Sequence, residues 1–261
     1  MGLFDGAKAT LTGNRAYKIH MEANKLAAAG KPREAAEKYR TALGLYEEAE
    51  RLGIEAQNIL RGYAILLMRE GHFDRADALM RRMGQMKNLS KDDWFELRVD
   101  YSICLWKLGQ LDKAIETIGR AAQQKMNGMI YGTLGMYRVE KAKVDGDFQA
   151  ALDFNLEALD YDDEDPSTLD NLGQLYEAMS AQGGEKAAEY RATAIDYYRR
   201  AHKAKPRQIT TIYYLARLFH QDGDDERARK LLSIRDTLYV SAICPITREM
   251  LDELAREVGG E

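Results

Sequence analysis

The chain has 261 residues, of which 45% are hydrophobic and 31% are charged, and it contains only 4 prolines. This composition favours a folded, helix-rich protein with a substantial core over a disordered one. The net charge of −4, from 38 basic and 42 acidic side chains, argues against a dedicated nucleic-acid binder, which would usually carry a basic excess.

Residues 1–13 contain no apolar stretch of signal-peptide length, and no window of about 18 apolar residues exists that could span a membrane. We expect these residues to form a short lead segment, either helical or disordered. The two cysteines, Cys104 and Cys244, form no Cys-x-x-Cys pair, which favours a reducing compartment. The sequence therefore predicts a cytoplasmic protein with no membrane partner.

One pattern recurs along the chain. A small residue is followed four positions later by a larger one, and often three positions further on by another small one. The six leading residues are Ala35, Ala76, Ala114, Ala151, Ala194 and Ala228. Spacings of four and three place such residues on one face of a helix. In five of the six cases a glycine stands five positions before the leading alanine: Gly30, Gly71, Gly109, Gly146 and Gly223. A glycine there would end a preceding helix and allow a tight turn.

The segment before each glycine has its own helical pattern, as in Leu169, Leu172, Gly173 and Tyr176. Each unit is therefore predicted to be a helix, a glycine turn and a second helix. Small residues are expected where the two helices approach closely. Strand patterns with a period of two residues are nearly absent.

An acidic run precedes the fifth first helix, in "ALDYDDEDPSTLDNLGQLYEA" from Ala158 to Ala178. Asp165 followed by Pro166 is typical of a helix start, with aspartate as the N-cap and proline at the first helical position. The alternative is a calcium loop that begins at Asp160. Such a loop needs glycine at its sixth position and glutamate at its twelfth, which here are Asp165 and Asn171. We favour a boundary between two helices.

The repeated unit resembles the tetratricopeptide repeat, a 34-residue helix pair with small residues at positions eight, twenty and twenty-seven. The fifth unit is the most similar, with "LDNLGQLYEA" as the first helix and "AIDYYRRAHKAKP" as the second, ending at Pro206. The resemblance implies an all-α fold, a right-handed α-α superhelix (a solenoid) of about six helix pairs with a C-terminal capping helix.

The implied array covers residues 14–242, in units of about 14–49, 54–90, 93–127, 128–165, 166–206 and 207–242. Several of these units are longer than 34 residues, the fifth through the segment Ser180–Thr193. Residues 243–261 are expected to form the capping helix, with Thr247 at its start.

Patterns of residues typical of catalysis are missing from the sequence. The four histidines have no metal-binding spacing, and neither a Gly-x-Ser-x-Gly motif nor a phosphate-binding glycine loop occurs. We therefore predict that the protein is not an enzyme and that it needs no metal or cofactor.

In proteins of this resemblance, one stripe of each first helix lines a concave groove. At about 100° per residue, that stripe lies beside the small-residue position, on the side away from the core contacts. The predicted groove residues are Asn24, Arg61, Ile65, Met68, Val99, Ile103, Trp106, Met129, Met136, Asn171, Gln174, Tyr213 and Arg217. Contiguous exposed apolar residues usually mark a binding surface. The alternative is that these side chains fill the space between adjacent first helices.

The resemblance implies a non-catalytic interaction scaffold or adaptor that binds a protein or peptide segment in this groove. A second possibility is a regulatory sensor that binds a small ligand or signalling peptide, with a pocket near Tyr213, Arg217 and His220. A third is an enzyme-associated subunit without chemistry of its own.

Some family members hold the terminal carboxylates of chaperone tails in a two-carboxylate clamp. Asn24 fits one clamp position, but the other four hold His20, Gly62, Glu96 and Asp100, of which the last two would repel a carboxylate. Chaperone C-terminal tails are therefore disfavoured as partners.

Overall fold

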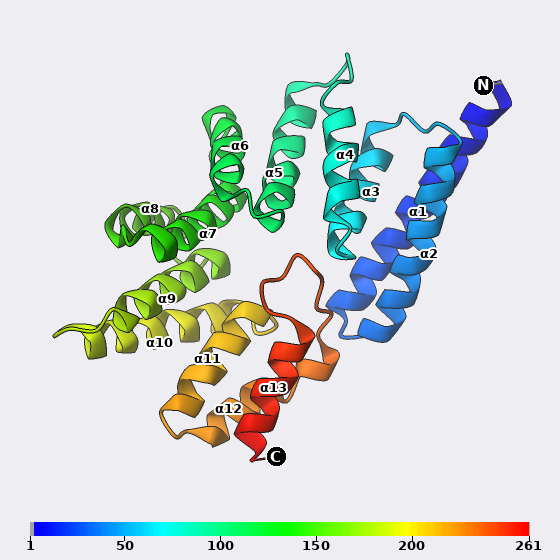
Figure 1. Cartoon of the computed structure of the whole chain (residues 1–261). Coiled ribbons are helices and arrows are strands. Elements are labelled where there is room, and N and C mark those ends of the chain that lie inside the picture. Colours follow the sequence, from blue (N-terminus) through cyan, green and yellow to red (C-terminus); the bar gives the residue numbers. More distant parts are fainter. Residues whose placement is uncertain (1–2, 261) are drawn as a thin grey trace. The chain divides into compact units, whose positions relative to one another are not determined.

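The computed structural model describes residues 3–260, with side chains from residue 6 onward, and these residues form α-helices and one short 3₁₀-helix but no β-strand. The predicted all-α fold is therefore confirmed. The chain forms two compact units (Figure 1). Unit 1 extends to Leu108 and also includes Asp236–Ile243, and unit 2 comprises Gly109–Arg235 and the chain from Cys244 onward.

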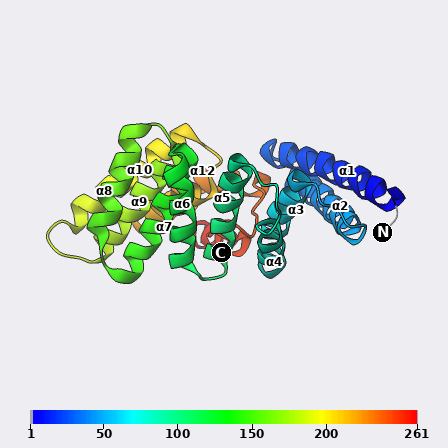
Figure 2. The same cartoon turned by 90° about the horizontal axis from the view of Figure 1, so that it is seen from above.

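In its described residues unit 1 contains five α-helices, which pack as neighbours in the order of the chain. They are α1 (Leu3–Ala28), α2 (Pro32–Arg51), α3 (Gln57–Arg69), α4 (Phe73–Met83) and α5 (Lys91–Lys107). The helices α1 and α2 lie side by side, as do α3 and α4 (Figures 1 and 2). The first helices are also in contact, α1 with α3 and α3 with α5. This arrangement brings one face of three successive first helices together.

Alanine stripes join α1 to α2. Ala9, Ala16 and Ala23 recur every seven residues on α1, and Ala35, Ala42 and Ala49 do the same on α2. All six side chains are buried. Because alanine adds only a methyl group, two such stripes let the helices approach closely, and the seven-residue period keeps the seam continuous along both helices.

The described residues of the expected lead segment are helical, which is one of its two alternatives, but they do not form a separate helix. Within the described residues, positions 3–13 are the first part of α1, which continues without a break to Ala28. Packing explains this continuity, because Ala9 is buried and a Cβ added at Gly13 would lie 2.7 Å from Ile59. Residues 1–2 lie outside the described part of the chain.

Unit 2 contains eight α-helices among the described residues. They are α6 (Leu111–Gln124), α7 (Gly128–Asp145), α8 (Phe148–Tyr161), α9 (Pro166–Ala181), α10 (Ala187–Ala204), α11 (Ile209–Gln221), α12 (Asp225–Leu232) and α13 (Arg248–Gly259). The pairs α7 with α8, α9 with α10 and α11 with α12 pack together, and α9 contacts both α7 and α11. A 3₁₀-helix, η1 (Arg235–Thr237), follows α12.

The last helix, α13, packs on α11 and α12 and buries Leu251, Leu254 and Val258. The predicted helix start is confirmed, because the Thr247 side chain accepts a hydrogen bond of 3.2 Å from the Met250 amide. The division between the two units falls after Leu108, inside the third expected repeat. The single array of residues 14–242 therefore stays a prediction.

Local signals set the helix boundaries. The five glycines predicted to end first helices all have positive φ, between 74° and 85°. At the acidic run, Asp165 is the N-cap of α9 and accepts a 2.7 Å hydrogen bond from the Thr168 amide, with Pro166 at the first helical position. Both expectations are confirmed. None of the described helices combines the length and the apolar character needed to cross a membrane.

Candidate functional site

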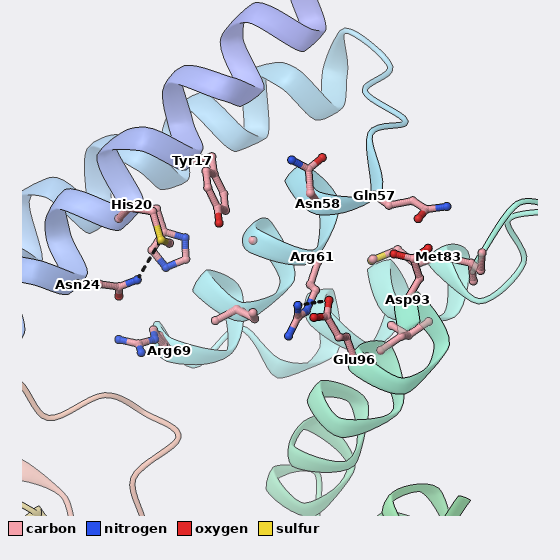
Figure 3. A pocket seen from close by; sticks show the side chains of 15 residues that line it. Tyr17, His20, Asn24, Gln57, Asn58, Arg61, Arg69, Met83, Asp93 and Glu96 are labelled. Carbon is pink, nitrogen blue, oxygen red and sulfur yellow. Dashed lines mark hydrogen bonds and ion pairs between the residues drawn. The ribbon is translucent and has the colours of Figure 1, made fainter. Parts of the chain in front are cut away.

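A cavity of about 340 Å³ opens on unit 1 along the first helices (Figure 3). Its wall comes mainly from α1, α3 and the start of α5. The lining residues are Tyr17, His20, Met21, Asn24, Gln57, Asn58, Arg61, Gly62, Ile65, Arg69, Met83, Leu89, Asp93, Glu96 and Leu97. We call this cavity, with these residues, the unit 1 groove.

A hydrogen-bond network holds one end of the groove. The Tyr39 hydroxyl donates to Oδ1 of Asn24 over 2.7 Å and accepts from the Arg69 guanidinium over 2.9 Å. The Tyr39 side chain is fully buried. Because a buried hydroxyl is costly without partners, this network fixes the positions of Asn24 on α1 and Arg69 at the end of α3.

Arg61 bridges α3 to α5. Its Nε lies 2.6 Å from Oδ2 of Asp100, and its NH1 group pairs with Glu96 (Figure 3). Burial raises the pKa of Asp100, and the Arg61 charge opposes that rise. Burial alone would lower the pKa of Arg61, but the two carboxylates raise it. The Arg61 charge is therefore already matched within unit 1.

His20 faces the groove from α1 and is nearly fully buried, with 1% of its surface exposed. Its ring makes edge-on contacts with Tyr39 and Tyr46, and Nδ1 lies 3.4 Å from the Tyr46 hydroxyl. Burial and the nearby Arg69 charge lower the pKa of His20 to about 4. The imidazole is therefore neutral at pH 7, and its Nε2 atom has no hydrogen-bond partner.

Three of the predicted groove residues, Asn24, Arg61 and Ile65, line the unit 1 groove. Ile103 and Trp106 are half-buried on α5 of the same unit. Ile103 packs against the core, and the Lys107 ammonium lies 5.1 Å from the centre of the Trp106 ring.

Four predicted groove residues are instead buried, and for these the prediction was wrong. Met68 is 1% exposed and Val99 3% exposed, so both side chains belong to the interior of unit 1. In unit 2, Asn171 is buried and donates a 2.9 Å hydrogen bond to the Gly132 carbonyl. Gln174 is also buried and donates to Asp170 while it accepts from Lys143. These polar groups join adjacent first helices, as the alternative interpretation expects.

The remaining predicted residues lie on unit 2. Met129 is 54% exposed and Met136 half-buried on α7. On α11, Arg217 pairs with Glu177 and lies over the rings of Tyr213 and Tyr214, at 5.6 and 5.0 Å from their centres. The ring nitrogen of His220, also expected in a sensor pocket, lies 2.6 Å from Asp225.

Met68 was predicted to line the groove, but Arg69 lines it instead, and helix geometry gives the reason. At about 100° per residue, Met68 is rotated by about 80° from the direction of Asn58, whereas Arg69 is rotated by only about 20°. Spacings of four along Arg61, Ile65 and Arg69 would have found it. Asp93 and Leu89 gave no such signal, because they come from the start of α5 and the loop before it.

Solved structures similar to the chain include several repeat proteins, although no protein-family model and no curated protein matches it. The human IFIT1 dimer with m7Gppp-AAAA has a TM-score of 0.59 at 18% identity, over 83% of this chain and 49% of IFIT1. Cut9 in the APC/C hetero-tetramer Cut9–Hcn1 has a TM-score of 0.55 at 18% identity, over 96% of this chain and 45% of that one. A tetratricopeptide protein of Thermus thermophilus, TTC0263, has a TM-score of 0.51 at 18% identity, over 63% of this chain and 83% of that one.

The chain has the tetratricopeptide-repeat fold. At this level of identity the likeness concerns the fold alone. The repeat region described above spans about half of the IFIT1 and Cut9 chains to which it is similar.

Proposed function

We propose that this tetratricopeptide-repeat protein is a non-catalytic scaffold whose unit 1 groove binds a peptide or a segment of a partner protein. The observation that carries the proposal is the groove itself. Three successive first helices supply one continuous wall, with Asn24 from α1, Ile65 from α3 and Glu96 from α5. A wall that three helices build in succession extends across all of them, which suits an elongated ligand.

The side chains of the groove suit the main chain of an extended segment. Asn24, Gln57 and Asn58 carry carboxamides, each of which both donates and accepts hydrogen bonds, as a peptide group does. Tyr17 and Ile65 add apolar surface beside them. An extended peptide could therefore bury apolar side chains while its own N–H and C=O groups stay paired.

Charge favours a peptide over a phosphate-rich ligand. The groove lining holds two arginines and two carboxylates, and Arg61 is already paired with Glu96 and Asp100. IFIT1 was solved with m7Gppp-AAAA, but a site for several phosphates would need an excess of cations. Glu96 and Asp100 would also repel the terminal carboxylate of a chaperone tail.

Peptide display on the wild-type chain tests this proposal. Peptides selected from a random library should bind more weakly to the variants Asn58→Ala and Ile65→Ser. We expect a loss of about tenfold for each, the effect of one lost buried hydrogen bond or apolar contact. Asn14→Ala, on an exposed position of α1, is the matched control and should bind as the wild type does. Selected peptides that bind all four proteins equally would contradict the proposal.

A small ligand is the second candidate, and the orphan Nε2 of His20 is the observation that favours it. A volume of about 340 Å³ falls within the range of small-molecule sites. A thermal-shift screen with a metabolite panel separates the two candidates. Stabilisation by a small molecule that is lost in His20→Phe would favour the sensor, whereas stabilisation by selected peptides alone favours the scaffold.

A further inference from the structure

Unit 1 already holds a largely irregular piece of chain from much later in the sequence. The segment Asp236–Ile243 belongs to unit 1 although it follows α12 in the sequence. We call these eight residues the return segment. Leu238 is buried, and Tyr239 and Ile243 pack against the hydrophobic core of unit 1. Residues 238–241 form no helix or turn.

Tyr239 lies against Tyr39 and Glu70, and we call these two residues the seat. The centre of its ring lies 4.9 Å from the centre of the Tyr39 ring. Its hydroxyl donates a 2.7 Å hydrogen bond to a carboxylate oxygen of Glu70, 169 residues earlier in the chain. Burial raises the pKa of Tyr239, and the hydrogen bond to Glu70 raises it further. The hydroxyl therefore stays protonated and keeps its role as a donor. A tyrosine satisfies both the ring contact and the carboxylate, whereas phenylalanine would leave the carboxylate without this donor.

Three positions later, Ala242 contacts the end of α3. Its amide donates a 2.9 Å hydrogen bond to the Arg69 carbonyl. Carbonyls in the last turn of a helix have no partner within the helix, so this end offers an acceptor to any extended segment beside it. A Cβ added at Gly71 would lie in ordinary contact with the Ala242 Cβ, at 3.4 Å, and Ala242 is half-buried. The feature that this position requires is therefore its backbone N–H, which proline lacks.

The return segment and the unit 1 groove both involve Arg69. Arg69 lines the groove and donates to the Tyr39 hydroxyl, while its carbonyl accepts from Ala242. Tyr39 in turn donates to Asn24, which also lines the groove. The place occupied by the return segment therefore adjoins the groove through Arg69 and Asn24, both part of the peptide site proposed above.

We propose that the partner segments of unit 1 carry a tyrosine followed three positions later by a residue with a backbone N–H (any residue except proline), and that they bind by replacing Tyr239 and Ala242 of the return segment. This inference rests on the proposed peptide-binding function and names its partner class. The return segment is part of the same chain, so it competes as an intramolecular ligand that an incoming peptide must displace. A partner must therefore bind the seat with enough affinity to displace Tyr239 of the same chain.

The test uses a labelled synthetic peptide of residues 236–243, DTLYVSAI, and the full chain. The wild-type chain should bind the peptide weakly, because its own segment fills the seat. Tyr239→Ala removes the ring and the hydroxyl from the tethered segment, and we expect it to bind the peptide at least about tenfold more tightly. Ala242→Pro, which removes the amide donor, should act in the same direction. Tyr161→Ala, which changes an exposed tyrosine of unit 2, is the control and should match the wild type.

Altered peptides test the pattern itself. In the Tyr239→Ala chain, peptides that carry Phe in place of tyrosine, or Pro in place of the alanine, should bind at least about tenfold more weakly than DTLYVSAI. Adding Glu70→Gln to that chain should weaken DTLYVSAI but leave the Phe peptide unchanged. Circular dichroism of each variant checks that helix content is kept.

Two results would overturn the inference. One is equal affinity of DTLYVSAI for the wild type and both releasing variants, and the other is peptide binding that is unaffected by the Phe and Pro replacements. Failure here can be told apart from failure of the proposed function. If displayed peptides bind in a way that depends on Asn58 and Ile65 but lack the pattern, the groove binds peptides and only the seat assignment is wrong.

Discussion

His20 lies between the rings of Tyr39 and Tyr46 on α1, where its imidazole is almost completely removed from water. The cost of burying a cation there, together with the charge of Arg69, lowers the pKa of His20 to about 4. In the unfolded chain the pKa would be near the ordinary value of 6.5. Between these two values the unfolded state binds a proton that the folded state does not.

The sign of the pH effect follows from this difference. Above pH 6.5 the imidazole is neutral in both states, so the free energy of unfolding is not reduced. As the pH falls from 6.5 to 4, protonation favours the unfolded chain, and the loss reaches about 3 kcal/mol at the lower end. Urea unfolding at pH 7 and at pH 4.5 should show this fall.

The variant His20→Gln should lose most of that pH dependence. His72→Gln, which changes an exposed histidine at the start of α4, should keep it and so corrects for the titration of carboxylates. An equal fall in the free energy of unfolding for both variants would show that His20 is not the titrating group.

Close packing of paired helices depends on positions where no side chain fits. In α9, a Cβ added at Gly173 would lie 2.7 Å from ring atoms of Tyr198 on α10, and that ring is fully buried. In α6, Gly119 is also a mid-helix glycine, but a Cβ there would meet nothing within 4 Å. Both glycines therefore carry the same entropic cost of fixing the backbone, but only Gly173 lacks room for a side chain.

Alanine at these two positions should change stability in opposite directions. Gly173→Ala would force α9 and α10 apart and should lower the free energy of unfolding by about 1–3 kcal/mol. Gly119→Ala removes backbone freedom from the unfolded chain and should raise it by up to about 1 kcal/mol. Thermal denaturation followed by circular dichroism measures both, and a raised Tm for Gly173→Ala would contradict the packing described here.

At the scale of the whole molecule, the two units are not two consecutive pieces of the sequence. Unit 1 is completed by the return segment, whose Tyr239 bonds to Glu70 across 169 residues. Closing so long a loop costs conformational entropy, so the contacts of the return segment must together offset that cost. The amide of Ala242 is a reporter for this long-range contact, because it is bonded to the Arg69 carbonyl of α3 and not within a helix of its own.

Hydrogen exchange should therefore protect the Ala242 amide in the wild-type chain. Tyr239→Ala should speed its exchange by at least about tenfold, because the seat then holds the segment less firmly. The Leu251 amide, bonded to Thr247 at the start of α13, should keep its rate. Unchanged exchange of Ala242 in the variant would show that the tyrosine does not hold the segment.

Part of the groove could be inferred from the sequence, and the limit has a physical reason. The direction of a side chain on a helix follows from its position, so Asn24, Arg61 and Ile65 could be placed on the first-helix stripe, and they do line the groove. Whether such a stripe is open or closed depends on the next helix. Val99 and Asn171 lie on the predicted stripe but are covered by packing that no local pattern encodes.

What the sequence alone determined is the set of local structures: the all-helical units, the glycine turns, and the helix starts at Asp165 and Thr247. These depend on neighbours within one or two turns, where propensity, capping and turn geometry act directly. Only the tertiary structure decided that Arg61 is neutralised by Asp100, that His20 is buried, and that Tyr239 returns to Glu70. The Arg61–Asp100 and Tyr239–Glu70 pairs are separated by 39 and 169 residues, and contacts over such distances are set by the packing of the whole unit.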